Sequence, residues 1–374
     1  MTCYNRIRRW LLITTLLGLG LFVLIGCNHR ACFGIVFASN RAGNFEIYRM
    51  TSEGHSVERL TYTPDYDEQV VKVSPDGSKI LFDRGGMRLE REVYLLDADS
   101  GIVSQLTDAL AYDIPGTWSP DGKRIAFISD RDGGCYHLYL MNSDGSEQHH
   151  VPLVTDSERD VISVTWSPDS RYIVYGTREH IHAHVVLTST LFIVDLSTSN
   201  VTRLTDEELG NCGGPTWSPD NEWIAMDCTK GISSDYKIYI VRPDGSELSQ
   251  VTIIGSELGA CWSPDWSPDG TWIATVCKGV SAGDYGEIYI IHPDGSDFKQ
   301  VTTKPADYKP DIPADSFLTW VRELHWSPDG RQIVYTATVD GTENIYIIDT
   351  DGKNNRRLTN HRAVDRWLSV YRLP

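Results

Sequence analysis

The chain has 374 residues, enough for one large domain or two ordinary ones, so core size does not limit the fold. It carries 51 acidic against 34 basic residues, a net charge of −17 at pH 7. A surface this negative repels phosphate backbones and anionic headgroups, which disfavours nucleic acid as a partner and leaves basic proteins, cationic peptides and divalent metals.

The first 26 residues have the layout of a secretion signal. Arg6, Arg8 and Arg9 precede an uncharged apolar run (residues 10–25), which Leu24-Ile-Gly-Cys27 closes. This ending resembles the lipobox of bacterial lipoproteins, which implies that Cys27 carries a lipid anchor; an uncleaved signal anchor is the alternative. Both readings place the body in the cell envelope, facing the periplasm or the exterior. Without these residues 31 basic and 51 acidic residues remain, a net charge of −20.

The rest of the chain is organised by a repeated phrase. Trp-Ser-Pro-Asp-Gly or a near copy recurs at spacings of 45, 48, 51, 49 and 60 residues, starting at Val73, Trp118, Trp166, Trp217, Trp266 and Trp326. Each copy precedes an alternating apolar run and an Ile-Tyr-type run; an Asp-Gly turn in most units and a short Leu-Thr or Val-Thr strand complete the pattern. Alternation at period two is typical of half-buried strands, so each unit predicts four antiparallel strands.

The phrase itself predicts a reversal between the first two strands of a unit. Proline pre-sets φ at the second turn position, aspartate tolerates the third, and glycine takes the left-handed fourth. Asn221 replaces that glycine in one unit, and Ser170 replaces it in another at some cost in strain.

A four-stranded sheet repeated along the chain is the blade of a β-propeller. Residues 35–61 supply the second to fourth strands of a unit without a first strand, and residues 365–373 read as a lone first strand. Joined, they complete a seventh blade and remove exposed sheet edges. The sequence therefore predicts an all-β, seven-bladed propeller over residues 35–374, after a signal peptide (1–26) and a short tether (27–34); six blades are the alternative.

These repeats resemble those of the TolB-like propeller group over about residues 35–373. The resemblance implies the fold and leaves function open, because one fold hosts many functions. TolB itself carries an α/β domain ahead of its propeller, whereas here the repeats begin within ten residues of Cys27. We therefore expect a family member that differs from TolB.

Strand order places the connections between the second and third strands, and those between units, on one face of the disc. These connections vary, and binding sites favour variable loops on a rigid scaffold. The candidate partner-binding residues on this face are Asp65, Asp67, Glu68, Asp113, Asp160, Glu207, Tyr308 and Trp320. Together the acids would form a negative mouth that steers cationic ligands, and the alternative is that they are solvated loop charges.

The cysteines predict two disulfides. Cys212 and Cys228 are symmetric about one turn, and Cys261 and Cys277 are symmetric about the next. Antiparallel register places each pair opposite across a hairpin, within bonding reach. In a further unit Glu68 and Arg84 take these positions as a cross-strand charge pair. A four-cysteine zinc site is the alternative, although no Cys-x-x-Cys is present; Cys32 and Cys135 are left over.

Two motifs suggest catalysis. Gly279-Val-Ser-Ala-Gly283 matches the nucleophile elbow of hydrolases, but it lies between two strands, where a repeat loop is expected. In an extended segment His180, His182 and His184 would point the same way and form a metal cluster; an exposed polar loop is the alternative. Oligogalacturonate lyases resemble this repeat group and use a metal with histidines.

The expected function is that of an envelope-anchored, non-catalytic, monomeric propeller that binds a protein or peptide, or a glycan, through its acidic variable face. The alternative is a metal-dependent polysaccharide lyase or hydrolase that uses the three histidines. No cofactor is expected, apart from the divalent metal of that alternative.

Overall fold

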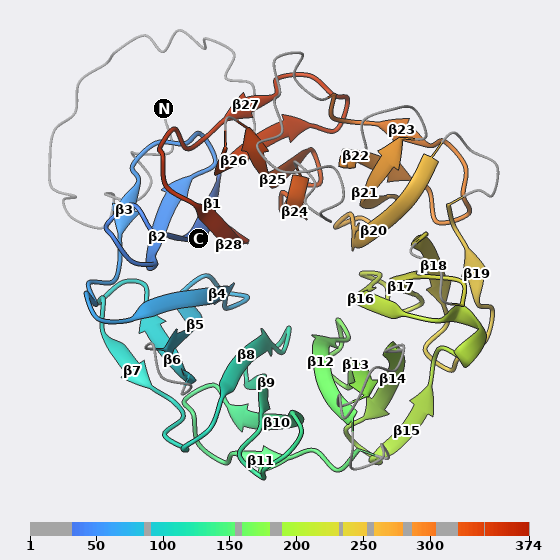
Figure 1. The fold of residues 1–374 in the computed structure, drawn as a ribbon, viewed down its shortest axis with the longest axis horizontal. Coiled ribbons are helices and arrows are strands. Elements are labelled where there is room, and N and C mark those ends of the chain that lie inside the picture. The colour runs from blue at the N-terminus through green and yellow to red at the C-terminus, as the bar shows by residue number, and fades with distance from the viewer. Residues whose placement is uncertain are drawn as a thin grey trace, which may run out of the picture.

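The computed structural model describes residues 32–85, 91–153, 159–179, 189–231, 235–252, 258–279, 286–303, 321–339 and 341–373. In these ranges the regular elements are β-strands and one short 3-10 helix, η1 (Glu207–Leu209). The strands form seven four-stranded antiparallel sheets arranged as a ring (Figure 1). This confirms the seven-bladed all-β propeller and rules out six blades. None of the described segments is a helix long and apolar enough to cross a membrane.

Each blade runs from an inner strand near the axis to a short outer strand (Figure 1). Blade A combines both chain ends: β28 (Asp365–Arg372), β1 (Phe33–Ser39), β2 (Glu46–Thr51) and β3 (Glu58–Arg59). Blade B holds β4 (Asp67–Val73), β5 (Lys79–Gly85), β6 (Arg91–Asp97) and β7 (Val103–Gln105). Blade C holds β8 (Asp113–Trp118), β9 (Arg124–Ser129), β10 (His137–Asn142) and β11 (His149–His150).

The remaining blades repeat this order. Blade D holds β12 (Arg159–Trp166), β13 (Tyr172–Glu179), β14 (Ser189–Asp195) and β15 (Asn200–Arg203). Blade E holds β16 (Cys212–Trp217), β17 (Ile224–Cys228), β18 (Lys237–Val241) and β19 (Ser249–Gln250). Blade F holds β20 (Leu258–Trp266), β21 (Ile273–Gly279), β22 (Gly286–Ile291) and β23 (Lys299–Gln300). Blade G holds β24 (Val321–Trp326), β25 (Gln332–Val339), β26 (Thr342–Asp349) and β27 (Arg356–Arg357).

Side-chain hydrogen bonds explain the Ser-Pro-Asp-Gly turns. In blade C the Ser119 hydroxyl donates to Asp121 Oδ1 (2.6 Å), which also accepts from the Lys123 amide (3.1 Å). The turns of blades B, D, E, F and G repeat this pair of bonds. The left-handed turn position has φ of 70° at Gly122, 60° at Ser170 and 63° at Asn221, as the sequence predicts.

The Leu-Thr and Val-Thr pairs join the outer strands. In blade B the Thr107 hydroxyl accepts from the Val93 amide (2.9 Å) and donates to Glu92 Oε2 (2.5 Å). A threonine accepts a strand-three amide in the same way in blades A, D, E, F and G. The outermost strands are short, so this side-chain bond supplements a brief backbone ladder.

The repeat's tryptophan joins neighbouring blades. The indole of Trp118 donates to the carbonyl of Lys72 (3.2 Å), and that of Trp166 donates to the carbonyl of Thr117 (3.2 Å). Both rings are buried. Each bond therefore reaches the inner strand of the preceding blade, and a buried aromatic ring fills the space between two sheets.

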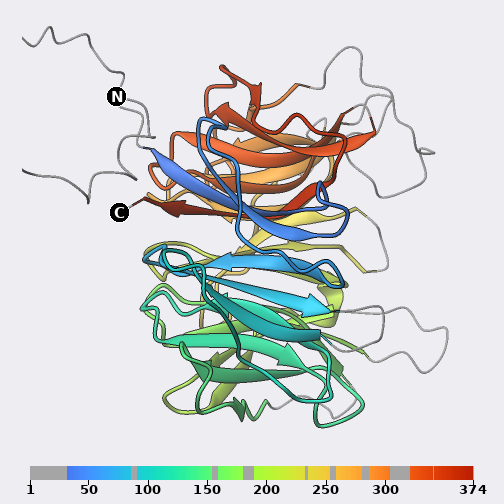
Figure 2. The same ribbon diagram turned by 90° about the vertical axis from the view of Figure 1, so that its left-hand side faces the viewer.

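The disc has two different faces. The turn face carries the Ser-Pro-Asp-Gly turns, and the loop face carries the connections between second and third strands and between blades. In blade A Phe33 pairs with Arg372, and the Arg372 side chain donates to the carbonyl of Pro328 in a turn of blade G (3.3 Å). Figure 2 shows β28 ending and β1 beginning on the same side of the disc. The described chain therefore enters and leaves at the turn face.

Candidate functional site

At the loop-face end of each of five blades, the inner strand is bonded to the hairpin of the second strand. Some blades use an ion pair there and others use a disulfide. In blades A, B and C a buried acid of the inner strand pairs with an arginine: Asp365–Arg41 (2.9 Å), Glu68–Arg84 (2.7 Å) and Asp113–Arg131 (2.7 Å). In blades E and F disulfides take this position. The cross-strand charge pair predicted in blade B is confirmed.

The acids predicted to form a negative mouth lie at the loop face in different surroundings. Glu68 and Asp113 are fully buried in their ion pairs. Asp160 is buried and accepts from the Tyr136 amide (2.9 Å), and Asp67 accepts from the Phe45 amide (2.8 Å). Asp65 is exposed. Arg84 and Arg131 therefore neutralise Glu68 and Asp113, and the predicted binding role of the set stays a prediction.

Several predicted residues cannot be placed in the same way. Glu207 begins η1, and its side chain is outside the described part of the structure. Tyr308, Trp320, the three histidines of the predicted metal cluster (His180, His182 and His184) and the predicted lipidation site Cys27 also lie outside the described residues.

The two predicted disulfides are confirmed. Cys212 faces Cys228, and Cys261 faces Cys277, each pair in direct register with a Cα–Cα distance of 4.1 Å. All four cysteines are buried. Cys135, one of the two cysteines left over, is also buried.

A cavity of about 720 Å³ lies beside these disulfides, between blades D, E and F. Its volume falls in the range of sites that hold small ligands. It is lined by Ile162, Arg178, Ser189, Asn211, Cys212, Gly213, Asp227, Asp235, Tyr236, Ala260, Trp262, Ser263 and Lys278. All three blades contribute, so the cavity depends on their relative placement.

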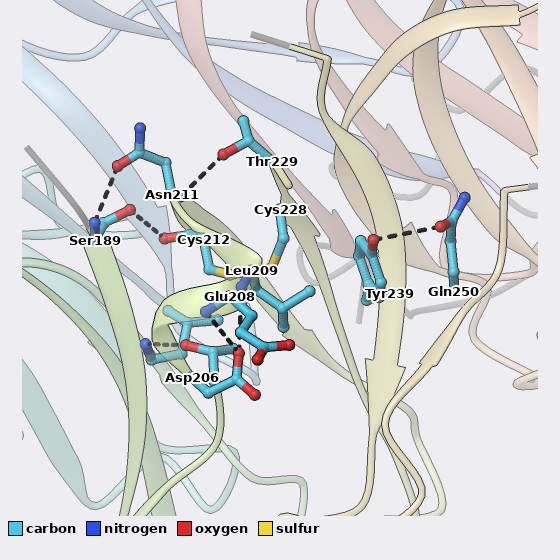
Figure 3. The surroundings of a disulfide bond; sticks show 12 residues. Ser189, Asp206, Glu208, Leu209, Asn211, Cys212, Cys228, Thr229, Tyr239 and Gln250 are labelled. Carbon is cyan, nitrogen blue, oxygen red and sulfur yellow. Dashed lines mark hydrogen bonds between the residues drawn. A yellow bond between two sulfur atoms is a disulfide. The ribbon is translucent and has the colours of Figure 1, made fainter. Parts of the chain in front are cut away.

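Hydrogen bonds join blades D and E at the wall of the cavity, and a disulfide within blade E holds its side of that wall (Figure 3). The Ser189 hydroxyl donates to the carbonyl of Cys212 (2.7 Å), and the Ser189 amide donates to Asn211 Oδ1 (3.1 Å). The Asn211 amide donates in turn to the Thr229 hydroxyl (2.9 Å). This wall is therefore pre-organised, which lowers the entropy lost when a ligand binds.

Asp227 is the distinctive charge of the cavity. It lies opposite Gly213 and is partly exposed; its own backbone amide bonds to the carboxylate, and no described side chain does so. Burial raises the pKa of Asp227 to about 6. Gly214 has φ of 54°, and a Cβ there would lie 2.5 Å from Asp227 Oδ1, so glycine leaves room for this carboxylate.

Two cations line the same cavity. Arg178 is exposed and Lys278 is partly buried, and neither side chain forms an ion pair within the described ranges. Asp235, the second acid, pairs with Lys237 (3.0 Å). Burial raises the pKa of Tyr236, and the nearby Asp227 charge raises it further. The described part of the cavity thus presents charges of both signs, Asp227 against Arg178 and Lys278, that form no ion pair within it, beside the rings of Tyr236 and Trp262.

Sequence reasoning missed this site. Its residues come from three blades, and none belongs to a recognised motif. One signal was available: Asp227 precedes Cys228 just as Asp83 precedes Arg84, so two blades place an aspartate at one inward position. Only the structure shows that Asp83 pairs with Arg91 while Asp227 has no such arginine among the described residues.

Comparison with protein families identifies the repeat. The family described as TolB beta propeller domain matches residues 84–188 and 134–323, which together exceed half of the chain. The chain belongs to this family. The TolB-like resemblance predicted from the repeats is therefore confirmed.

Individual relatives match a smaller part of this chain than the family model does. The Tol-Pal system protein TolB of Francisella tularensis subsp. holarctica is 31% identical over 130 residues, 35% of this chain and 28% of that protein. The uncharacterized peptidase YuxL of Bacillus subtilis is 25% identical over 207 residues, 45% of this chain and 31% of that protein. The chain therefore spans less than a third of the length of either relative.

Among solved structures, an oligogalacturonate lyase in complex with manganese has a similar fold. It is 20% identical, with a TM-score of 0.63, over 88% of this chain and 85% of that chain. This likeness and that to YuxL correct the expectation of a non-catalytic protein, because the relatives of this TolB-like propeller include enzymes. The manganese belongs to the lyase. Within the described ranges of this chain, no group of three histidine, cysteine or acidic residues is placed to hold a metal.

Proposed function

We propose that this protein is a cell-envelope propeller that binds a peptide segment of a partner protein in the cavity between blades D, E and F. The observation that carries the proposal is that Asp227, Arg178 and Lys278 line one pre-organised cavity beside two aromatic rings, with no ion pair to any of the three among the described residues. Peptides offer the complementary groups: charged termini and side chains, amides and apolar surface.

The disulfides and the chain ends support an envelope location. Disulfides persist in exported proteins and are rare in the cytosol. An anchor at Cys27 would lie six residues before Phe33, which is at the turn face. Six residues span at most about 20 Å. Such a tether would hold the turn face toward the membrane and direct the loop face, with its cavity, toward a partner.

The family supports a protein partner. TolB of Francisella tularensis is a protein of the Tol-Pal system, and it shares these repeats. The partner of the present chain need not be the same, because the match covers 28% of that TolB.

Site-specific photocrosslinking in cells tests this function. A photoreactive residue replaces Ser263 in the cavity wall, and in a control it replaces Thr271 on the turn face; captured proteins are identified by mass spectrometry. We expect a partner that is captured from position 263, absent from position 271, and lost when Trp262 is also changed to Ala. Equal capture from both positions would contradict the proposal.

A second candidate function follows from the same cations. Arg178 and Lys278 would bind the carboxylate of an acidic oligosaccharide, Trp262 would stack on a sugar ring, and Asp227, with a pKa of about 6, would exchange a proton near neutral pH. The fold likeness to an oligogalacturonate lyase favours this class.

Incubation with uronate oligosaccharides tests the second candidate, because a lyase product absorbs in the ultraviolet. Activity that Asp227→Asn abolishes and Asp235→Asn retains would support it. No product from any uronate oligosaccharide would reject it.

A further inference from the structure

We infer that the cavity recognises the free amino terminus of a peptide, with the ammonium group at Asp227 and a carboxylate of the same peptide toward Arg178 and Lys278. This inference rests on the proposed function and adds to it the chemical class of the ligand.

Among the described residues, the Asp227 carboxylate lacks a counter-charge. A carboxylate removed from water loses hydration free energy, and structures normally compensate with a cation or hydrogen-bond donors. At the equivalent position of blade B, Arg91 contacts Asp83. Asp227 is partly exposed to the cavity, its own backbone amide bonds to the carboxylate, and no described side chain supplies a positive charge there. A ligand that brings N–H donors and positive charge supplies the missing partner.

An ammonium group suits this role better than a metal ion does. A divalent cation takes several oxygen, nitrogen or sulfur ligands, and among the described residues no three histidine, cysteine or acidic residues are grouped. An ammonium group needs one carboxylate and is also attracted to aromatic faces. Tyr236 and Trp262 line the same cavity, and the charge of Asp227 raises the pKa of Tyr236.

The two cations of the cavity indicate what the rest of the ligand carries. Arg178 and Lys278 also have no ion pair among the described residues, and they line the cavity with Asp227. A ligand with only a positive group would leave these cations without a counter-charge and would be repelled by them. A peptide carries an ammonium and a carboxylate on one small molecule, so it matches charges of both signs.

Isothermal titration calorimetry on the purified full-length protein tests the inference with three probes: trialanine, N-acetyl-trialanine and trialanine amide. We expect trialanine to bind at least about tenfold more tightly than the acetylated probe, because acetylation removes a charge-assisted hydrogen bond. The amide should also bind more weakly, and Arg178→Ala with Lys278→Ala should abolish that difference.

The matched variants are Asp227→Asn and Asp235→Asn. Both remove one acid from the cavity, but Asp235 is already paired with Lys237. We expect Asp227→Asn to abolish the preference for the free amino group and Asp235→Asn to retain it. Equal affinity for free and acetylated probes, an unchanged preference in Asp227→Asn, or no binding of trialanine at millimolar concentration would each overturn the inference.

These outcomes are separable from those of the proposed function. Capture of a partner from position 263, together with equal binding of the free and acetylated probes, would keep the peptide-binding function and reject amino-terminal recognition. Failure of capture from position 263 would reject the function itself.

Discussion

Blades B and E solve the same structural problem with different chemistry. In blade B the inner strand is joined to the second strand by Glu68 and Arg84, and the adjacent Asp83 contacts Arg91. In blade E a disulfide replaces the first pair, and the adjacent Asp227 has no described cation beside it. The propeller frame is common to both blades. Charge is therefore neutralised internally in blade B, whereas in blade E it is left available to a ligand.

Removal of a disulfide should give the largest effect. Cys212→Ser with Cys228→Ser opens a loop with a sequence separation of 16 residues. A crosslink of this span contributes about 3 kcal/mol to the free energy of unfolding in the chain-entropy description. We expect a lower urea midpoint by circular dichroism and no further loss at this site on adding reductant. A double variant as stable as the wild type would show that blade E does not depend on its covalent bond.

Replacement by asparagine should change the free energy of unfolding in opposite directions at Asp83 and Asp227. Asp83→Asn removes the partner of Arg91 and should lower stability. Asp227→Asn removes a partly buried charge whose pKa burial raises from 3.8 to about 6, a shift equivalent to at most about 3 kcal/mol. We therefore expect Asp227→Asn to be more stable than the wild type at pH 8 in urea unfolding.

The pH dependence fixes the sign of that effect. Because the folded state holds the Asp227 proton more tightly than the unfolded state, wild-type stability falls as pH rises from about 4 to about 6. The advantage of Asp227→Asn should therefore be complete above pH 6 and vanish below about pH 4. An advantage that persists unchanged at pH 3.5 would assign the effect to something other than this ionisation.

The fold could be predicted from the sequence because its signals are local and repeated. Each Ser-Pro-Asp-Gly turn is stabilised by bonds within a few residues, as at Ser119 and Asp121. The two disulfides could be predicted in the same way, because two residues placed symmetrically about a turn lie opposite each other in an antiparallel hairpin.

The cavity could not be predicted because it depends on contacts between blades. Arg178, Asp227 and Lys278 are separated by about 50 residues each, and their meeting follows from the ring geometry. For the same reason the acidic loops could not be judged from charge alone. Glu68 and Asp113 lie at the predicted face, but their arginines, Arg84 and Arg131, neutralise them.

The buried ion pair of blade C should contribute less than the disulfide of blade E. Asp113→Asn removes the charged acceptor of Arg131, and a hydrogen bond between charged groups contributes about 2 kcal/mol. We expect a loss of this size in urea unfolding. The exposed pair of Asp351 and Lys353 is the control, and Asp351→Asn should leave the midpoint unchanged. Equal effects of the two substitutions would remove the distinction between the buried pair and the surface pair.

The smallest change in stability is expected at the turn of blade D, where serine replaces the glycine of most other turns. Ser170 occupies the position that glycine takes in most turns, and its hydroxyl accepts from the Asp121 amide of blade C (3.1 Å). Ser170→Ala keeps the left-handed φ and loses this bond, which should cost about 1 kcal/mol. Ser170→Gly loses the same bond but relieves about 1 kcal/mol of strain, so it should unfold near the wild-type midpoint. Because Asn221 Oδ1 accepts from the Asp169 amide in the same way (3.1 Å), Asn221→Ala should repeat the loss. If both alanine variants matched the wild type, these residues would be tolerated replacements for glycine and not links between blades.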